Sequence, residues 1–258
     1  MQNFMLETIN LVKSFGGLVA LNHLNFGIRH GQIKSIIGPN GAGKTTLFNL
    51  ICGIQPPSEG KIILGVESLN GLRPHNIARK GISRTFQNLR LFGDMSVLEN
   101  IMVGCQCGAK HKFLSSAFKL PSSTKREKLM EKDSMEILSF LGIEPFAKDQ
   151  ASNLPFGYQK MIEIARALAT KPKLLLLDEP ASGLNDHERN QLSLLISKIR
   201  ESGLTILLVE HNMDLVMKVS DEILVLNYGS KIAEGTPSEI QNNQDVIDAY
   251  LGEDFKYA

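Results

Sequence analysis

Apolar residues along the chain follow two different periods, and together these predict an α/β fold. Near the N-terminus, Leu24, Phe26 and Ile28 alternate with polar or small residues, which is the period of a strand with one buried face. Short, mostly apolar segments further on predict strands at 33–37, 61–64, 174–177, 205–209 and 223–226. Helical periods are expected at 45–51 and near 186–202. Strands that are apolar throughout and alternate with helices indicate a mainly parallel sheet covered on both faces.

The stretch from about 93 to 170 has a helical period instead. One stripe of a predicted helix consists of Met130, Ser134, Ile137, Leu138 and Leu141. A second stripe, on a helix expected after Gln159, consists of Met161, Ile164, Ala165 and Leu168. The pattern predicts a single domain over residues 1–258, with a helical subdomain at about 93–170 inserted into the α/β core.

The charge balance narrows the classes of function. The chain has 28 Lys and Arg against 27 Asp and Glu, a formal net charge of +1. A dedicated nucleic-acid binder is usually strongly basic, so we expect no nucleic-acid partner. No apolar run approaches the roughly 18 residues of a spanning helix, and the first residues lack the pattern of a signal peptide. The three cysteines form no Cys/His set for zinc and indicate a reducing compartment.

A glycine-rich loop lies between the predicted strand at 33–37 and the helix at 45–51. It fits the pattern G-x4-G-K-[ST], and its residues are Gly38, Pro39, Asn40, Gly41, Ala42, Gly43, Lys44 and Thr45. Glycines in such a loop let successive backbone N–H groups face phosphate oxygens, and the helix dipole adds positive potential. We therefore expect Lys44 to contact the β- and γ-phosphates of a nucleotide and the Thr45 hydroxyl to bind Mg²⁺.

Two carboxylates follow the buried strand at 174–177. Asp178 at the strand end is expected in the outer shell of the metal, and Glu179 is expected to polarise a water for in-line attack on the γ-phosphorus. The loop and this strand together predict a nucleoside-triphosphate site. Because many NTPases share both motifs, other residues must decide the class.

Five further features appear in a set order along the chain. They are Phe15, Gln87 within 84–87, the segment 154–158 before a helix, the segment 182–185, and His211 after the strand at 205–209. With these features the sequence resembles the ATP-binding subunits of ABC transporters over essentially its whole length. The resemblance implies a P-loop NTPase core with an N-terminal antiparallel β-subdomain and an inserted helical subdomain. It also implies ATP hydrolysis that depends on Mg²⁺.

The resemblance assigns a role to each of these features. Phe15 matches the aromatic residue that stacks on adenine, and the loop from Gly38 to Thr46 holds the phosphates. Gln87 matches a glutamine that senses the metal and the attacking water, and His211 a histidine that contacts the γ-phosphate. In a head-to-tail dimer, the other subunit completes the ATP site. The residues matched to that contribution are Pro155, Phe156, Gly157, Tyr158 and Asn185.

Three of these residues depart from the family pattern. Pro155 replaces a serine and so removes a hydroxyl and a backbone N–H, while Phe156 replaces a glycine. Asn185 replaces an aspartate and removes a charge. Weaker ATP-driven dimerisation is the consequence to test. The ATPases of branched-chain amino-acid importers, which the chain resembles most at 82–92, 154–157, 210–217 and 246–252, tolerate a non-serine residue at the position of Pro155.

This second resemblance implies a place and partners for the chain. It would lie on the cytoplasmic face of the membrane as a peripheral subunit, bound to membrane permease subunits and served indirectly by a solute-binding protein. Leu89, Leu91, Phe92 and Met95 are candidates for a groove that receives a permease helix, or else they pack between the lobes.

Several alternatives stay open. The dimer partner is a second copy or a related ATPase, and urea importers and lipopolysaccharide exporters have similar subunits. Other P-loop classes fit less well. A small-molecule kinase would lack the segment at 154–158 and His211, and a chromosome-maintenance ATPase needs a long heptad insertion for which 258 residues leave no room.

Overall fold

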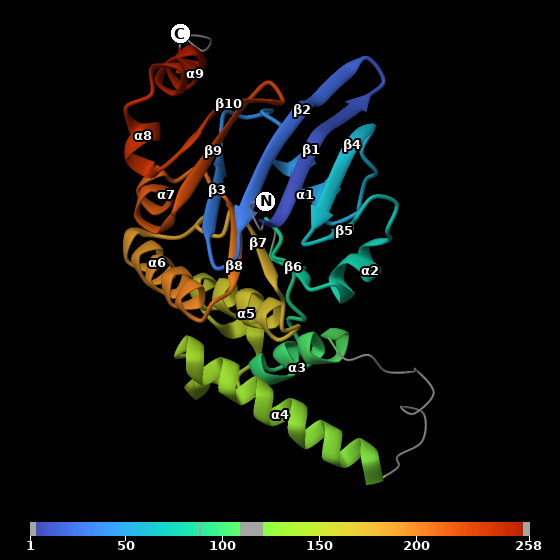
Figure 1. The fold of residues 1–258 in the computed structure, drawn as a ribbon. Helices are drawn as coiled ribbons and strands as arrows, with labels where there is room; N and C mark the ends of the chain where they lie inside the picture. The colour runs from blue at the N-terminus through green and yellow to red at the C-terminus, as the bar shows by residue number, and fades with distance from the viewer. Residues whose placement is uncertain (1–3, 88, 109–120, 255–258) are drawn as a thin grey trace. The chain divides into compact units, whose positions relative to one another are not determined.

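Two β-sheets with their helices form one unit of the computed structural model, and a helical segment forms another. The model describes residues 4–87, 89–108 and 121–254. Unit 1 comprises Met1–Arg84 and Lys173–Ala258, and unit 2 comprises Thr85–Pro172 (Figure 1). Asn88, which belongs to one of the stretches that carry the resemblance, and residues 255–258 lie outside the described residues.

The first sheet of unit 1 is antiparallel, with strand order β2-β1-β4-β5. Its strands are β1 (Phe4–Phe15), β2 (Leu18–Arg29), β4 (Glu59–Leu64) and β5 (Glu67–Ser68). Along β2, the side chains of Leu24, Phe26 and Ile28 are buried, so the alternation predicted from the sequence is confirmed. The expected N-terminal antiparallel sheet is therefore present.

The second sheet of unit 1 has strand order β10-β9-β3-β8-β7-β6 and is parallel except for β10, which pairs antiparallel with β9. Its strands are β3 (Ile33–Ile37), β6 (Ile82–Arg84), β7 (Leu174–Asp178), β8 (Thr205–Val209), β9 (Glu222–Asn227) and β10 (Ser230–Gly235). Every residue of β3, β7 and β8 is buried, as expected for parallel strands covered on both faces. The mainly parallel sheet predicted from the apolar runs is confirmed.

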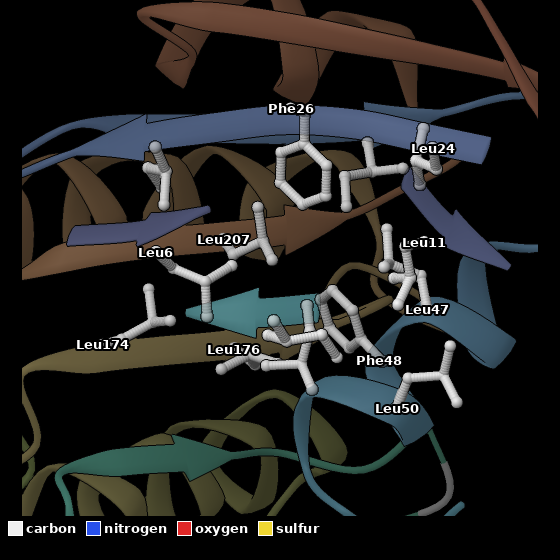
Figure 2. Close-up of a cluster of buried hydrophobic side chains, with 14 of the residues drawn as sticks. Leu6, Leu11, Leu24, Phe26, Leu47, Phe48, Leu50, Leu174, Leu176 and Leu207 are labelled. Atoms are coloured by element: carbon white, nitrogen blue, oxygen red, sulfur yellow. The ribbon is translucent and has the colours of Figure 1, made fainter. Parts of the chain in front are cut away.

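A large apolar core joins residues of both sheets with helix α1 (Lys44–Ile51). Figure 2 shows Leu6 and Phe26 of the antiparallel sheet, Phe48 of α1, and Leu176 and Leu207 of the parallel sheet within one cluster. Burial of side chains of this size stabilises the fold by about 1.5–3 kcal/mol each. The core thus anchors α1, and with it the loop that precedes this helix.

Unit 1 contains further helices besides α1. They are α2 (Pro74–Arg79), α6 (Asp186–Glu201), α7 (Met213–Val219), α8 (Pro237–Gln241) and α9 (Gln244–Asp254). A second apolar cluster joins Ile37 and Ile223 of the sheet with Val216 of α7, Ile240 of α8 and Val246 of α9. The opposite face of β3 and β9 is therefore covered by α7, α8 and α9.

Unit 2 is helical. It contains α3 (Val97–Gly108), α4 (Pro121–Leu141), α5 (Phe156–Leu168) and the short 3₁₀ helices Glu144–Phe146 and Ala151–Asn153. Helix α3 packs against both α4 and α5. The predicted stripe on α4 is confirmed by the buried side chains of Ser134, Leu138 and Leu141. Among the described residues, no helix combines the length and apolar character needed to cross a bilayer.

The start of α5 corrects one prediction. The sequence predicted a helix after Gln159, but α5 begins at Phe156, so Phe156, Gly157 and Tyr158 lie in its first turn. Pro155 is the N-cap residue, with φ −52° and ψ 150°. Because proline cannot donate a backbone hydrogen bond, it suits the position just before a helix. The Gln159 side chain turns back and donates to the Leu154 carbonyl over 2.7 Å.

Candidate functional site

Three loops with the predicted chemistry leave the same edge of the parallel sheet. The glycine-rich loop follows β3, Glu179 follows β7, and His211 comes shortly after β8. Since β3, β8 and β7 are adjacent parallel strands, their carboxyl ends lie side by side. Ligands of open α/β sheets bind at this edge.

The glycine-rich loop requires its glycines for two different reasons. A Cβ on Gly38 would lie 2.0 Å from the Leu226 carbonyl oxygen, and one on Gly43 would lie 2.6 Å from that of Ala20. The backbone of the loop therefore packs directly against β9 and β2. Gly41 meets nothing within 4 Å, but its φ of +79° favours glycine. A side chain at any of these three positions would displace or strain the loop.

Lys44 follows this loop and directs its ammonium group back into it. Its side chain is buried, and its Nζ donates to the carbonyls of Gly38 over 2.6 Å and Pro39 over 2.8 Å. Ala42 also donates to the Pro39 carbonyl, over 3.2 Å, which closes the turn around Asn40. Helix α1 begins at Lys44, and Thr45 and Thr46 follow in its first turn, Thr45 exposed and Thr46 half-buried.

Asp178 ends strand β7 in a buried ion pair. Its Oδ2 accepts from Arg84 Nη2 over 2.6 Å, and the exposed fractions of the Arg84 and Asp178 side chains are only 9% and 5%. Arg84 also donates to Asn49 Oδ1 of α1 over 2.8 Å. The guanidinium therefore links the carboxylate of β7 to the helix that follows the glycine-rich loop. Sequence analysis did not assign Arg84 a role, although a charged residue in a strand of an apolar sheet indicates a buried partner.

Glu179 adopts a strained backbone conformation, with φ +49°, which is uncommon for a residue other than glycine. Its N–H donates to the Val209 carbonyl of β8 over 2.9 Å. Its side-chain Oε1 lies 3.2 Å from His211 Nε2. The structure thus brings together two residues that are 32 positions apart in the sequence and that were predicted for the same site.

Glu210 is a buried carboxylate beside this pair, and sequence analysis assigned it no function. It accepts backbone hydrogen bonds from Ala181, His211 and Asn212. Burial raises the pKa of the Glu210 carboxyl, these hydrogen bonds oppose that shift, and the charge of Glu179 adds to it. An acidic residue directly after an apolar strand was the signal that could have identified it.

Phe15 lies at the end of β1, where the chain turns into β2. Its side chain is 44% exposed, and the Lys13 ammonium lies 4.9 Å from its ring centroid. In β2, Ala20 and Leu21 approach Gly43 of the glycine-rich loop. An exposed ring on this hairpin is able to stack on a flat aromatic ligand.

Asn185 is the N-cap residue of α6. Its side-chain Oδ1 accepts from the Glu188 N–H over 3.0 Å, and Glu188 Oε2 accepts from the Asn185 N–H over 3.0 Å. Asn and Asp cap helices about equally well, so the missing charge leaves this helix start intact.

The remaining predicted site residues lie in unit 2. Gln87 is exposed, and its backbone carbonyl accepts from Lys160 Nζ of α5 over 3.3 Å. One residue earlier, the Phe86 N–H donates to Glu163 of α5 over 3.1 Å. Pro155 and Phe156 are exposed at the start of the same helix. Helix α5 therefore holds both the Gln87 segment and the segment predicted to face a second subunit.

The structure also places Tyr158 and the residues of the candidate groove. Tyr158 packs against Phe146, with ring centroids 4.8 Å apart. Of the candidate groove residues, Phe92 is 47% and Met95 38% exposed, while Leu89 and Leu91 are half-buried.

The residues present fit a nucleotide and its Mg²⁺ ion. The glycine cradle and the Lys44 ammonium at a helix N-terminus suit phosphate oxygens. The exposed Thr45 hydroxyl and the Asp178 carboxylate at the end of β7 are oxygen donors, which Mg²⁺ prefers.

Family models and curated relatives match this chain closely. The model described as "ABC transporter" matches residues 21–182, and the model described as "Branched-chain amino acid ATP-binding cassette transporter" matches residues 230–256. The high-affinity branched-chain amino acid transport ATP-binding protein BraF of Pseudomonas aeruginosa is 46% identical, over 96% of this chain and 98% of that protein. The corresponding protein LivG of Escherichia coli is 45% identical over the same shares.

Solved structures agree in fold. The ADP conformation of an ATP-binding cassette of an ABC transporter superposes with a TM-score of 0.85 at 32% identity, covering 96% of this chain and 99% of that one. The dimeric post-hydrolysis state of another ATP-binding cassette, bound to ADP and phosphate, gives a TM-score of 0.75 at 26% identity, with shares of 90% and 99%. The predicted P-loop NTPase fold is confirmed.

Proposed function

The chain belongs to the ABC transporter family of ATP-binding subunits, and from this premise we propose that it powers the import of branched-chain amino acids. Nucleotide binding and ATP hydrolysis follow from the family itself. The observation that carries the proposal is the meeting of the glycine-rich loop, Glu179 and His211 at one edge of the parallel sheet. The branched-chain substrate is supported by the names of the relatives that match nearly the whole chain.

Each part of the site has a proposed role in binding ATP. Phe15 stacks on the adenine, and the N–H groups of the loop together with Lys44 hold the phosphates. Thr45, Asp178 and Gln87 would hold Mg²⁺, and Arg84 fixes the Asp178 carboxylate. When bound, the ion neutralises charge that develops on the phosphate oxygens.

Hydrolysis proceeds by attack of water in line with the bond between the γ-phosphorus and the β–γ bridging oxygen. Glu179 accepts a proton from the water as the new oxygen–phosphorus bond forms and the bond to ADP breaks. His211 donates to a γ-phosphate oxygen from its position 3.2 Å from Glu179. The products are ADP and inorganic phosphate.

A second subunit completes the site. We assign Pro155, Phe156, Gly157, Tyr158 and Asn185 to contacts with the ATP held by the partner, which is a second copy or a related ATPase. Without the serine hydroxyl and its N–H, the first turn of α5 contributes its remaining N–H groups and its dipole. Loss of the γ-phosphate then releases the closed dimer.

Transport requires partners in the membrane. The exposed Phe92 and Met95 lie shortly after the Gln87 segment and suit an apolar contact with a permease helix. The permease would hold this chain at the cytoplasmic face of the membrane, and a solute-binding protein would deliver the amino acid. We expect no nucleic-acid partner.

Reconstitution tests this function. The chain is purified with its co-expressed permease in detergent and placed in proteoliposomes with the solute-binding protein. We expect ATP hydrolysis and uptake of leucine to rise together when leucine is added, and a Lys44→Ala variant to show neither. Stimulation by urea but not leucine would assign the chain to a urea importer. Outward movement of lipopolysaccharide would assign it to an exporter, and phosphorylation of a small molecule to a kinase.

A further inference from the structure

The Glu210 carboxylate lies directly beside Glu179 and His211 and takes no part in the steps above. Its residue is only 3% exposed. A carboxylate is costly to bury, so a buried one is expected to be held by several donors. Glu210 meets this expectation with three backbone N–H groups and no side-chain donor among those described.

The three donors come from two separate segments. Glu210 Oε1 accepts from the Ala181 N–H over 2.6 Å, which lies in the turn after β7. Glu210 Oε2 accepts from the His211 N–H over 2.9 Å and from the Asn212 N–H over 3.2 Å, in the loop after β8. One carboxylate therefore ties the turn after β7 to the loop after β8.

The two segments that Glu210 joins carry Glu179 and His211, the residues proposed to act on the attacking water and the γ-phosphate. These residues are also linked by contacts of their own. The Glu179 N–H donates to the Val209 carbonyl over 2.9 Å, and Glu179 Oε1 lies 3.2 Å from His211 Nε2. Glu179 also has its backbone at φ +49°. A residue keeps such a conformation only when its surroundings hold it there, and the Ala181–Glu210 bond lies two residues away.

We propose that Glu210 is a positioning residue for ATP hydrolysis, which holds the turn of Glu179 and the loop of His211 at a fixed separation. The inference rests on the proposed function, in which these two residues act on the attacking water and the γ-phosphate. In this role Glu210 acts through the two segments that it joins and needs no contact with the nucleotide. Its effect should appear in the rate of the chemical step and not in nucleotide affinity.

The change Glu210→Gln tests this role because it preserves the shape of the side chain. The amide has one accepting oxygen, so its NH₂ group must face either the Ala181 N–H or the N–H groups of His211 and Asn212. One of the two segments then loses its anchor. Since misplacement by about 1 Å can cost 100-fold in rate, we expect kcat to fall about 10- to 100-fold. KM and the Kd of a fluorescent ATP analogue should stay within about threefold.

Glu210→Asp supplies a second variant in which the charge is kept. Its carboxylate is one methylene shorter and cannot reach both segments, so kcat should fall while the fold is retained. Asp221→Asn is a matched control. Asp221 also joins two segments, accepting from the Ile33 N–H over 2.8 Å and from Arg200 over 2.6 Å, but at the opposite end of β3.

The His211 imidazole provides a readout that is independent of hydrolysis. In nucleotide-free protein, both Glu210 variants should shift its NMR signals, whereas Asp221→Asn should leave them and kcat unchanged. Wild-type kcat in either Glu210 variant, unshifted His211 signals, or an equal loss of rate in Asp221→Asn would overturn the proposal. If the wild-type chain does not hydrolyse ATP, the proposed function fails, but the His211 signals still decide whether Glu210 sets the position of this residue.

Discussion

Replacement of Glu179 by glutamine should lower the rate of ATP hydrolysis without changing the fold or the binding of the nucleotide. The amide has the same shape and keeps the backbone hydrogen bond from residue 179 to the Val209 carbonyl. The strain at φ +49° is also the same in both proteins, because it belongs to the backbone. The side-chain contact with His211 Nε2, 3.2 Å away, changes in character, because the carboxylate becomes a neutral amide.

The size of each effect can be worked out from these contacts. The His211 side chain is 41% exposed, so its contact with Glu179 contributes no more than about 1 kcal/mol to stability. A general base contributes about 10²- to 10⁴-fold to rate, and an amide cannot accept the proton. The activation barrier should therefore rise by about 3–5 kcal/mol. The loss of rate exceeds any loss of stability.

The assay compares phosphate release at saturating Mg²⁺-ATP with binding of a fluorescent ATP analogue. We expect Glu179→Gln to reduce kcat at least 100-fold, to bind nucleotide normally and to unfold in urea within about 1 kcal/mol of wild type. Glu239→Gln, the same chemical change at the cap of α8, is the control and should keep full activity. Turnover within about threefold of wild type in Glu179→Gln would refute the role of general base. Light scattering of this variant with ATP also tests dimerisation, and a stable dimer would show that Pro155 and Asn185 do not prevent it.

Three further outcomes are expected. Lys44→Ala should lower ATP affinity more than tenfold in a binding titration, because the buried ammonium at the centre of the loop is lost, and unchanged affinity would contradict its phosphate role. Phe15→Ala should weaken ATP binding by about 1–3 kcal/mol, whereas Phe15→Trp should not, and equal affinities by calorimetry would remove the ring from the adenine site. Burial alone would raise the pKa of Glu234, but hydrogen bonds from Lys231 and Lys34 hold it below its ordinary value. The unfolding free energy of the wild type should therefore exceed that of Glu234→Gln at pH 7. This difference should decline as the pH falls below about 4.5 toward the lowered pKa. A difference that grows in acid would contradict the lowered pKa of Glu234.

Local pattern was sufficient for most strands of the fold. The apolar runs at 174–177 and 205–209 correspond to β7 and β8, whose residues are all buried. A run of this kind can be stable only between two covered faces, so its position follows from its composition. The glycine-rich loop was equally evident, because its glycines and lysine are adjacent in the sequence.

The hydrophobic pattern did not predict elements whose stability depends on residues distant in the sequence. Strand β6 contains Ser83 and Arg84 and was not predicted, because the charge of Arg84 is tolerated there through distant partners, which include Asp178, 94 positions away. The start of α5 was placed four residues too late, since Phe156 and Gly157 are weak helix formers and the N-cap geometry of Pro155 decides the boundary.

The sequence by itself determined the α/β class and the glycine-rich loop, because both are encoded in neighbouring positions, and its resemblance to a family predicted the residues that we propose to handle ATP. Only the tertiary structure decided that Glu179 is strained, that it lies 3.2 Å from His211, and that Glu210 joins the two segments that carry them. The physical reason is that backbone N–H groups have no sequence signature. Any residue except proline can supply the donors that Ala181 and His211 offer to Glu210, and only the folding of β7 beside β8 brings them to one carboxylate.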